Sequence, residues 1–429
     1  MLLEINWTDI AYHLFVYDPK RPLLFNSAAF LVLFLVVYGL FIPMRRATTL
    51  RTLYLLAFSI FFYYKSSGLF FILLLISTAW NFGLGHLMYT ATSKPSRIFY
   101  LLLSLVGSLG LLGYYKYTNF FIGSVNAIAG TEFAFQKIFL PVGISFFTFQ
   151  TLSYTIDVYR GDLKPISAEA RTFGDWLLSL ADFAFYVSFF PQLVAGPIVR
   201  ASDFIPQIRQ PLGLTRENLG YALLLISGGL FKKAVISDYI SVNFVDRIFA
   251  NPGLYSGFEN LMGVYGYAIQ IYCDFSGYSD MAIGLALLFG FKLAENFRSP
   301  YKAISIQDFW QRWHISLSTW LRDYLYISLG GNKKGKFRTY LNLMITMLLG
   351  GLWHGANWVY IVWGALHGAA LAIDRFLKNM GRIWANPAIR AWLILLIVQV
   401  CCHIAIWQIY AAGDLDELEY ADLLNGNLF

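Results

Sequence analysis

The sequence predicts an all-α polytopic membrane protein, and composition and the character of its apolar runs support this fold class. Hydrophobic residues make up 58% of the 429 positions and charged residues only 13%, which is far more apolar than a soluble chain. Apolar runs long enough to cross a hydrocarbon core of about 30 Å recur along most of the sequence. The run at 31–40 is apolar at nearly every position, whereas a strand of a membrane barrel would alternate apolar and polar residues. The spans are therefore predicted to be helices.

The charge and the cysteines argue against other classes. The net charge of +7 comes from 32 Lys and Arg against 25 Asp and Glu, and in a membrane protein such an excess is typical of cytoplasmic loops rather than of nucleic-acid binding. Cys273, Cys401 and Cys402 lie inside apolar segments without metal-ligand spacing, so we interpret them as packing residues. The N-terminus lacks the basic region and cleavage site of a signal peptide.

The first third of the chain predicts an interfacial segment followed by four membrane helices. Arg45, Arg46 and Arg51 follow the first helix and indicate a cytoplasmic loop, with the N-terminus outside. The second helix shows only 12 apolar residues, so it is either a short span or part of a longer helix that reaches back toward Arg51. The interfacial segment is expected at 1–22 and the helices at 23–42, 53–64, 69–88 and 98–114.

In the middle of the chain, apolar segments are interrupted by proline and glycine or end in charged residues. At 139–159, Pro141 and Gly143 indicate either non-helical backbone buried at membrane depth or a proline in the first turn of an ordinary helix. Lys232 and Lys233 are interpreted as a snorkelling helix end. Further segments are expected at 176–190, 219–231, 261–291, 359–373 and 391–409, for a single domain over 1–429 with about ten to twelve membrane segments.

The segment at 261–291 carries Asp274, Ser276, Ser279 and Asp280 within seven residues. Ionisable groups inside a membrane segment are costly, so they are either paired or functional. These side chains form either a structural polar network or a contact with substrate.

The stretch from 307 to 355 carries the predicted chemistry. Trp310, Trp313, Leu317, Trp320 or Leu321, and Tyr324 recur at intervals of three and four, which predicts an amphipathic helix over 307–328 lying in the membrane plane. His314 falls on the apolar side of that helix.

A second histidine, His354, ends the apolar run 340–352 and is flanked by Gly350, Gly351 and Gly355. These glycines would let a backbone or a ligand approach the imidazole closely. A lone histidine on an apolar face is more often a core residue than a catalyst, but the pair predicts a general base at neutral pH.

Other catalytic templates are missing from the sequence. We find no G-x-S-x-G elbow, P-loop, H-E-x-x-H motif or Cys/His cluster for a metal. What remains is a histidine base that uses a nucleophile supplied by the substrate. The basic loop 332–338, with Lys333 and Lys334, is either a positive-inside loop or a binding site for the phosphates of coenzyme A or a phosphopantetheine carrier.

Five motifs resemble one known family. They are LPVGISFFTFQTLSY (140–154), YVSFFPQLVAGPIVR (186–200), DFSGYSDMAIGLALLFGF (274–291), FWQRWHISLSTWLRDYLYISLGGN (309–332) and GGLWHGANWVYIVWGALHG (350–368). In this order they strongly resemble the membrane-bound O-acyltransferase (MBOAT) family, in its bacterial branch of alginate O-acetyltransferases and D-alanine exporters. The motif core covers about residues 140–375.

The resemblance implies a ring of membrane helices around a central funnel, with re-entrant and interfacial helices. The family's W-H-G histidine falls on His354, which would deprotonate an acceptor hydroxyl, and its R-W-H-x-S histidine falls on His314, which would orient or hydrogen-bond donor or acceptor. The substrate-binding residues that we predict around this pair are Asp280, Asn357, Trp353, Trp313, Lys333 and Lys334. No permanently bound cofactor is expected. The donor would be acetyl-CoA or another acyl thioester.

The L-G-G-N piece resembles polysaccharide O-acetylating members, so we expect acetyl transfer to hydroxyls of an exported or cell-envelope polysaccharide, in a bacterial cytoplasmic membrane. An extracytoplasmic SGNH-type acyltransferase is the expected partner. The alternatives are D-alanyl or other acyl transfer from a carrier protein and, outside enzymes, an ion- or proton-coupled transporter. Such members usually continue beyond the equivalent of Phe429, so either a final helix pair is missing or this is a short form.

Overall fold

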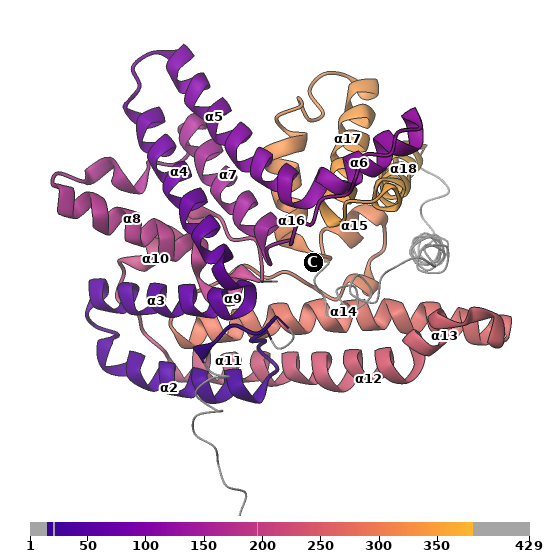
Figure 1. The fold of residues 1–429 in the computed structure, drawn as a ribbon, viewed down its shortest axis with the longest axis horizontal. Coiled ribbons are helices and arrows are strands. Elements are labelled where there is room, and N and C mark those ends of the chain that lie inside the picture. Colours follow the sequence, from indigo (N-terminus) through magenta and orange to yellow (C-terminus); the bar gives the residue numbers. More distant parts are fainter. Residues whose placement is uncertain (1–14, 20–21, 195, 381–429) are drawn as a thin grey trace, which may run out of the picture. The chain divides into compact units, whose positions relative to one another are not determined.

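The structure, a computed structural model, describes residues 15–19, 22–194 and 196–380, and the regular elements of these ranges are all helical (Figure 1). This confirms the all-α class. The helices are α2 (Ala28–Met44), α3 (Thr48–Ser67), α4 (Phe71–Thr90), α5 (Lys94–Leu112), α6 (Thr118–Ala129), α7 (Ile144–Arg160), α8 (Phe173–Ser188), α9 (Phe190–Leu193), α10 (Ala201–Ile208), α11 (Arg216–Leu230), α12 (Asp238–Ile240), α13 (Asp246–Ala250), α14 (Gly257–Leu288), α15 (Ile306–Trp310), α16 (Ile315–Trp320), α17 (Lys336–His354) and α18 (Trp358–Met380).

The chain forms two compact units, each assembled from separate segments. Unit 1 comprises Met1–Asn119, Ala134–Ile226 and Met281–Leu293, and unit 2 comprises Phe120–Phe133, Ser227–Asp280 and Ala294–Phe429. Both histidines of the predicted site belong to unit 2. The single domain over 1–429 stays a prediction.

An aromatic core holds unit 1 together. Phe25, Phe30, Phe62 and Phe190 are at most 1% exposed, and neighbouring rings approach to between 4.9 Å and 6.3 Å. Tilted and edge-on arrangements of this kind suit the charge distribution of the rings.

Hydrogen bonds also join the helices α4, α5 and α7, which stand side by side in unit 1 (Figure 1). The Ser104 hydroxyl donates to Asn81 Oδ1 at 2.6 Å and to Thr155 Oγ1 at 3.0 Å. The Asn81 amide donates to Ser108 Oγ at 3.1 Å. Small polar residues at such interfaces satisfy one another where lipid offers no partner.

The interruption before α7 is non-helical backbone in which Pro141 is buried and Gly143 is partly buried. The helix begins at Ile144, so Pro141 lies before it and the interpretation of a proline in the first helical turn is wrong. Gly143 has φ +73°, and a Cβ there would lie 2.3 Å from the Leu193 carbonyl oxygen. Tyr63 donates to the Val142 carbonyl at 2.7 Å, so a side chain of α3 supports this irregular segment.

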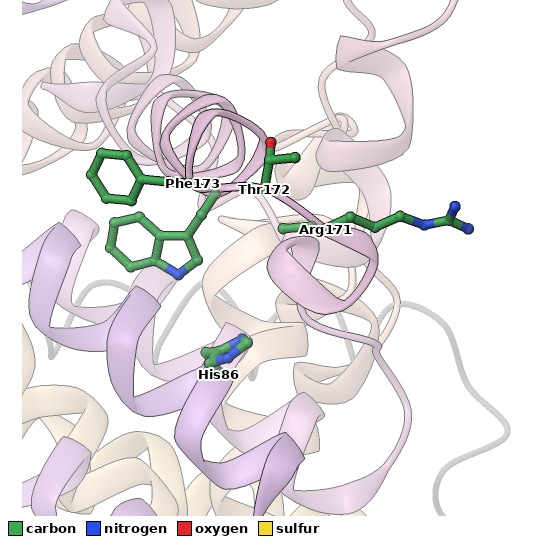
Figure 2. A pocket seen from close by; sticks show the side chains of 6 residues that line it. His86, Arg171, Thr172 and Phe173 are labelled. Carbon is green, nitrogen blue, oxygen red and sulfur yellow. The ribbon is translucent and has the colours of Figure 1, made fainter.

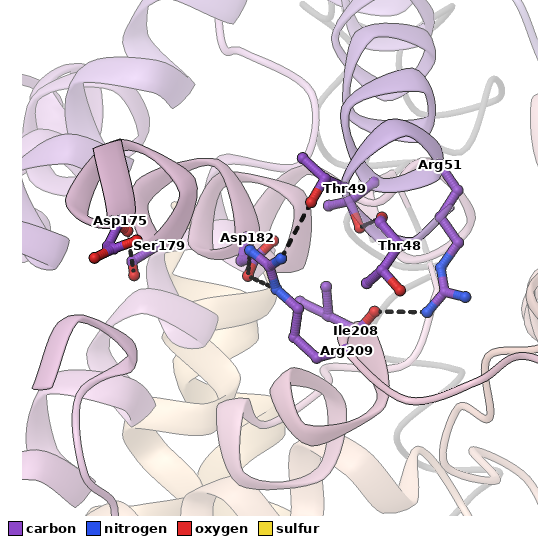
Figure 3. Close-up of polar contacts among 9 residues, drawn as sticks. Thr48, Thr49, Arg51, Asp175, Ser179, Asp182, Ile208 and Arg209 are labelled. Atoms are coloured by element: carbon purple, nitrogen blue, oxygen red, sulfur yellow. Dashed lines mark hydrogen bonds and ion pairs between the residues drawn. The ribbon is translucent and has the colours of Figure 1, made fainter. Parts of the chain in front are cut away.

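Arg51 is a buried anchor rather than a loop residue, because α3 begins at Thr48 and includes it. This confirms the longer second helix and removes Arg51 from the basic loop. Its side chain is 1% exposed and donates to the Ile208 carbonyl at 2.8 Å. Nearby, Arg209 pairs with Asp182 of α8 at 2.5 Å (Figure 3). These arginines tie α3, α8 and α10 together.

Three helical stretches of the described residues are long and apolar enough to cross a membrane. They are Thr48–Thr90, Lys94–Ala129 and Arg216–Ala250, and Ala28–Met44 is a shorter apolar helix. Large apolar side chains such as Leu35 (68% exposed) and Val106 (70% exposed) point outward, which suits contact with lipid. The predicted span 391–409 and most of the interfacial segment 1–22 lie outside the described residues.

Candidate active site

The turn that carries His314 replaces the continuous amphipathic helix predicted over 307–328. α15 ends at Trp310, α16 begins at Ile315, and His314 between them adopts the left-handed conformation, with φ 42° and ψ 57°. The Ile315 amide donates to the Asn296 carbonyl at 2.9 Å, whereas in a continuous helix it would donate four residues back. The prediction of one helix is wrong because the segment before α15 captures this amide.

His314 is enclosed by aromatic rings. Its side chain is 1% exposed, the Phe275 ring lies edge-on at 4.8 Å, and the Trp353 ring centroid lies at 6.1 Å. Nδ1 lies 3.0 Å from Asn296 Oδ1. The turn lies outside the three apolar helical stretches described above. Burial is the main cause that lowers the pKa of His314 well below its usual value, and the neighbouring His354 is the second cause. The imidazole is therefore neutral at physiological pH.

His354 occupies the last residue of α17 and is only partly buried. The rings of Trp353 and Trp363 each lie 5.1 Å from its ring. Because Trp353 also contacts His314, the predicted pair is brought together around one indole. His354 thus offers an accessible imidazole next to an enclosed one.

The glycines of this region allow α17 and α18 to approach closely. A Cβ on Gly351 would lie 2.1 Å from the Tyr360 carbonyl oxygen, and a Cβ on Gly364 would lie 2.3 Å from the Met347 carbonyl oxygen. A Cβ on Gly355 would meet the Tyr360 ring at 2.0 Å. The sequence predicted that either a backbone or a ligand would approach Gly351 closely. The structure shows close backbone approach at Gly351, and also at Gly364.

The remaining predicted site residues separate into distinct environments. Trp313 packs among Phe297 at 5.1 Å and Phe309 at 5.6 Å. Asn357 precedes α18, and its Oδ1 accepts from the Val359 amide at 3.1 Å, which is a helix-capping interaction. Among the predicted substrate-binding residues, Trp353 contacts the rings of both histidines.

Asp280 and Asp274 are engaged in ion pairs within unit 2. Lys232 pairs with Asp280 at 2.6 Å, and Lys233 pairs with Asp274 and with Asp238. Both lysines lie in a π-helical segment, Phe231–Ser237, inside the helical stretch that continues to Ala250. The interpretation of these lysines as a helix end is therefore wrong, and the pairing favours the structural polar network.

Lys333 and Lys334 lie at the far end of α17 from His354. They are exposed in the turn before Lys336, and the 19 residues of α17 correspond to a length of about 28 Å. These lysines therefore cannot contact an acyl group at His354, although they remain available to a remote part of a long donor.

Three further residues of this site were missed in the sequence. Asn296 contacts His314, while Trp363 and His367 extend the ring contacts from His354, with 4.4 Å between the Trp363 and His367 rings. Trp363 and His367 stand nine and thirteen residues after His354, within the motif 350–368. Asn296 had no comparable signal, because its contact spans 18 residues across two irregular segments.

A pocket of about 420 Å³ in unit 1 contains none of the predicted site residues. It is lined by His86, Trp176 and residues 170–173 (Figure 2). His86 Nδ1 lies 2.9 Å from the Ser167 hydroxyl.

The fold and the site together define an all-helical membrane protein with two neighbouring histidines, one enclosed and one accessible. Residues 125–408 match MBOAT, the membrane-bound O-acyltransferase family. The chain belongs to this family and is a polytopic membrane acyltransferase. An enzyme is thus confirmed over a transporter.

Curated relatives refine this assignment. The chain is 44% identical over 386 residues to the probable alginate O-acetylase AlgI of Pseudomonas putida, covering 88% of this chain and 76% of the relative. It is 40% identical to the peptidoglycan O-acetyltransferase of Helicobacter pylori, covering 87% and 74%. The teichoic acid D-alanyltransferase of Bacillus subtilis is 28% identical, covering 63% and 67%.

Proposed function

We propose that this protein transfers an acetyl group from a thioester donor to a hydroxyl of an exported or cell-envelope polysaccharide, with His354 as the general base. The observation that carries the proposal is the partly exposed His354 at the end of α17, beside Trp353 and the buried His314. A neutral imidazole that substrate can reach is suited to proton removal near neutral pH.

The reaction needs no nucleophile from the protein. The acceptor oxygen attacks the acyl carbonyl while His354 takes the hydroxyl proton, and the carbon–sulfur bond then breaks. The imidazolium returns the proton to the thiolate, so donor and acceptor leave as a thiol and an ester. A general base of this kind contributes about 10²–10⁴ in rate.

Acetyl transfer is favoured over D-alanyl transfer by the relatives. Those named for O-acetylation reach 44% identity over 88% of the chain, whereas the B. subtilis D-alanyltransferase reaches 28% over 63%. Acetyl-CoA or another cytosolic acyl thioester is the proposed donor. The bacterial cytoplasmic membrane is the proposed location, and an extracytoplasmic SGNH-type acyltransferase is the proposed partner.

The test replaces His354 by Ala in cells that O-acetylate an envelope polysaccharide. Ester content of the polymer should fall to background while the amount of protein in the membrane stays unchanged. His86→Ala is the matched control, because His86 lies in unit 1 and contacts Ser167. Retained acetylation in His354→Ala would overturn the assignment, and alanyl rather than acetyl esters in the wild-type polymer would favour the second candidate.

A further inference from the structure

Asn296 contacts His314 although the mechanism above does not use it. It lies between α14 and α15, is 0% exposed, and places Oδ1 3.0 Å from His314 Nδ1. Its Nδ2 lies 3.1 Å from the Ser279 hydroxyl of α14. A fully buried amide is retained only where its polar atoms are satisfied.

The orientation of the Asn296 amide follows from a backbone donor. The Ser316 amide can only donate, and it lies 3.3 Å from the atom assigned as Oδ1. The Ser316 hydroxyl lies 2.8 Å from the same atom. If the amide were flipped, two N–H donors would face each other. The atom that faces His314 is therefore the carbonyl oxygen.

This orientation determines the tautomer of His314. The Ser316 hydroxyl also lies 3.5 Å from His314 Nδ1, but it donates to Asn296 Oδ1 at 2.8 Å. Because Oδ1, 3.0 Å from Nδ1, can only accept, we infer that Nδ1 carries the proton and donates. In the neutral ring Nε2 then holds a lone pair. Nε2 is buried, and no described residue lies within hydrogen-bonding reach of it.

Asn296 also stabilises the backbone of the turn. Its carbonyl accepts from the Ile315 amide at 2.9 Å and its side chain accepts from the Ser316 amide, so it caps α16 from outside the helix, where His314 provides no side-chain cap. A non-glycine residue at φ 42° persists only when its surroundings hold it. Asn296 thus sets both the backbone and the ring of His314.

We propose that Asn296 is a positioning residue that holds His314 with its proton on Nδ1, so that Nε2 keeps its lone pair and can only accept a hydrogen bond. Neutral His314 then cannot donate a hydrogen bond to the carbonyl oxygen of the thioester. The use of that lone pair in acyl transfer rests on the proposed function, whereas the tautomer does not.

The tautomer can be measured without substrate. Full-length protein with [¹⁵N]histidine is placed in phospholipid bilayers, and ¹⁵N solid-state NMR separates protonated from unprotonated ring nitrogens. The chain has six histidines, and the His314 signals are those lost in His314→Gln. Wild-type protein should show a protonated Nδ1 and an unprotonated Nε2 for His314.

Two variants of similar size separate positioning from packing. Asn296→Asp keeps an acceptor oxygen and should keep the proton on Nδ1, whereas Asn296→Leu removes the acceptor and should shift the proton toward Nε2. Acetylation should fall by about ten- to a hundredfold in Asn296→Leu, by analogy with the loss of partners that orient metal-binding histidines. It should be at least partly restored in Asn296→Asp.

Asn342→Leu is the packing control, because Asn342 is also 0% exposed in unit 2 but donates to the Gly331 carbonyl at 3.0 Å. It should leave the His314 signals unchanged. A wild-type His314 protonated on Nε2, or an unchanged tautomer in Asn296→Leu, would overturn the proposal. Retained acetylation in His354→Ala would overturn the proposed function while leaving the tautomer result standing.

Discussion

His314 and His354 differ in exposure, and this difference is the basis for the separate roles proposed for them. The enclosed His314 has one nitrogen engaged by Asn296 and the other facing no described partner. His354 is partly exposed at the end of α17. The proposed function therefore assigns the role of base to His354 alone and not to two equivalent histidines.

The charges of α14 permit a residue-scale prediction. Asp280→Leu should lower the stability of the detergent-solubilised protein by about 2 kcal/mol, because Lys232 is left without its charged partner at 2.6 Å. The double variant Lys232→Met/Asp280→Leu should recover both thermal stability and acetylation if the pair is structural. Thermal unfolding and polymer ester content are the measurements.

The control for this prediction is Arg298→Ala, which removes an ion pair whose side chains are 67% and 48% exposed and should leave stability unchanged. If the double variant is stable but inactive, the result favours the alternative prediction that Asp280 contacts substrate.

At the scale of elements, the close contact of α17 with α18 positions His354. Gly351 lies one helical turn before His354, and its Cα approaches the Tyr360 carbonyl so closely that no side chain fits. The two helices must therefore separate if a side chain is introduced, and His354 would move with its own helix.

Gly351→Ala should destabilise the protein by about 1–3 kcal/mol, the usual cost of overpacking, and should reduce acetylation strongly. Gly39→Ala in α2 is the matched control, because a Cβ there has nothing within 4 Å and alanine favours helices. Thermal unfolding and acetylation assays test both. Wild-type stability in Gly351→Ala would contradict the assigned role of this contact.

At the scale of the whole molecule, the apolar stretch Lys94–Ala129 predicts a topology. If it crosses the membrane, the end that begins with Lys94 and Arg97 is cytoplasmic and the loop after it is outside. In a background without the three natural cysteines, Glu132→Cys should react with an impermeant maleimide in intact cells. Thr92→Cys should react only after the membrane is permeabilised, and the reverse pattern would invert the topology.

Several features were predictable because they depend on local sequence. Composition determined the helical membrane class, and glycine and proline placement located the break before α7. The motifs around His314 and His354 located the pair, and the helix at 53–64 was predicted with its extension toward Arg51 as one alternative. The prediction of one helix over 307–328 was wrong. The periodicity of this segment carries no information about the Asn296 carbonyl, which accepts the hydrogen bond of the Ile315 amide.

The sequence by itself determined the class of protein, its family and the two histidines that carry the proposed chemistry. Only the tertiary structure decided the contact of His314 with Asn296, the pairing of Asp280 with Lys232 and the burial of Arg51. The physical reason is that apolar periodicity and motif spacing are local properties of the chain. A hydrogen bond between Asn296 and His314 exists only after the fold has brought two irregular segments together.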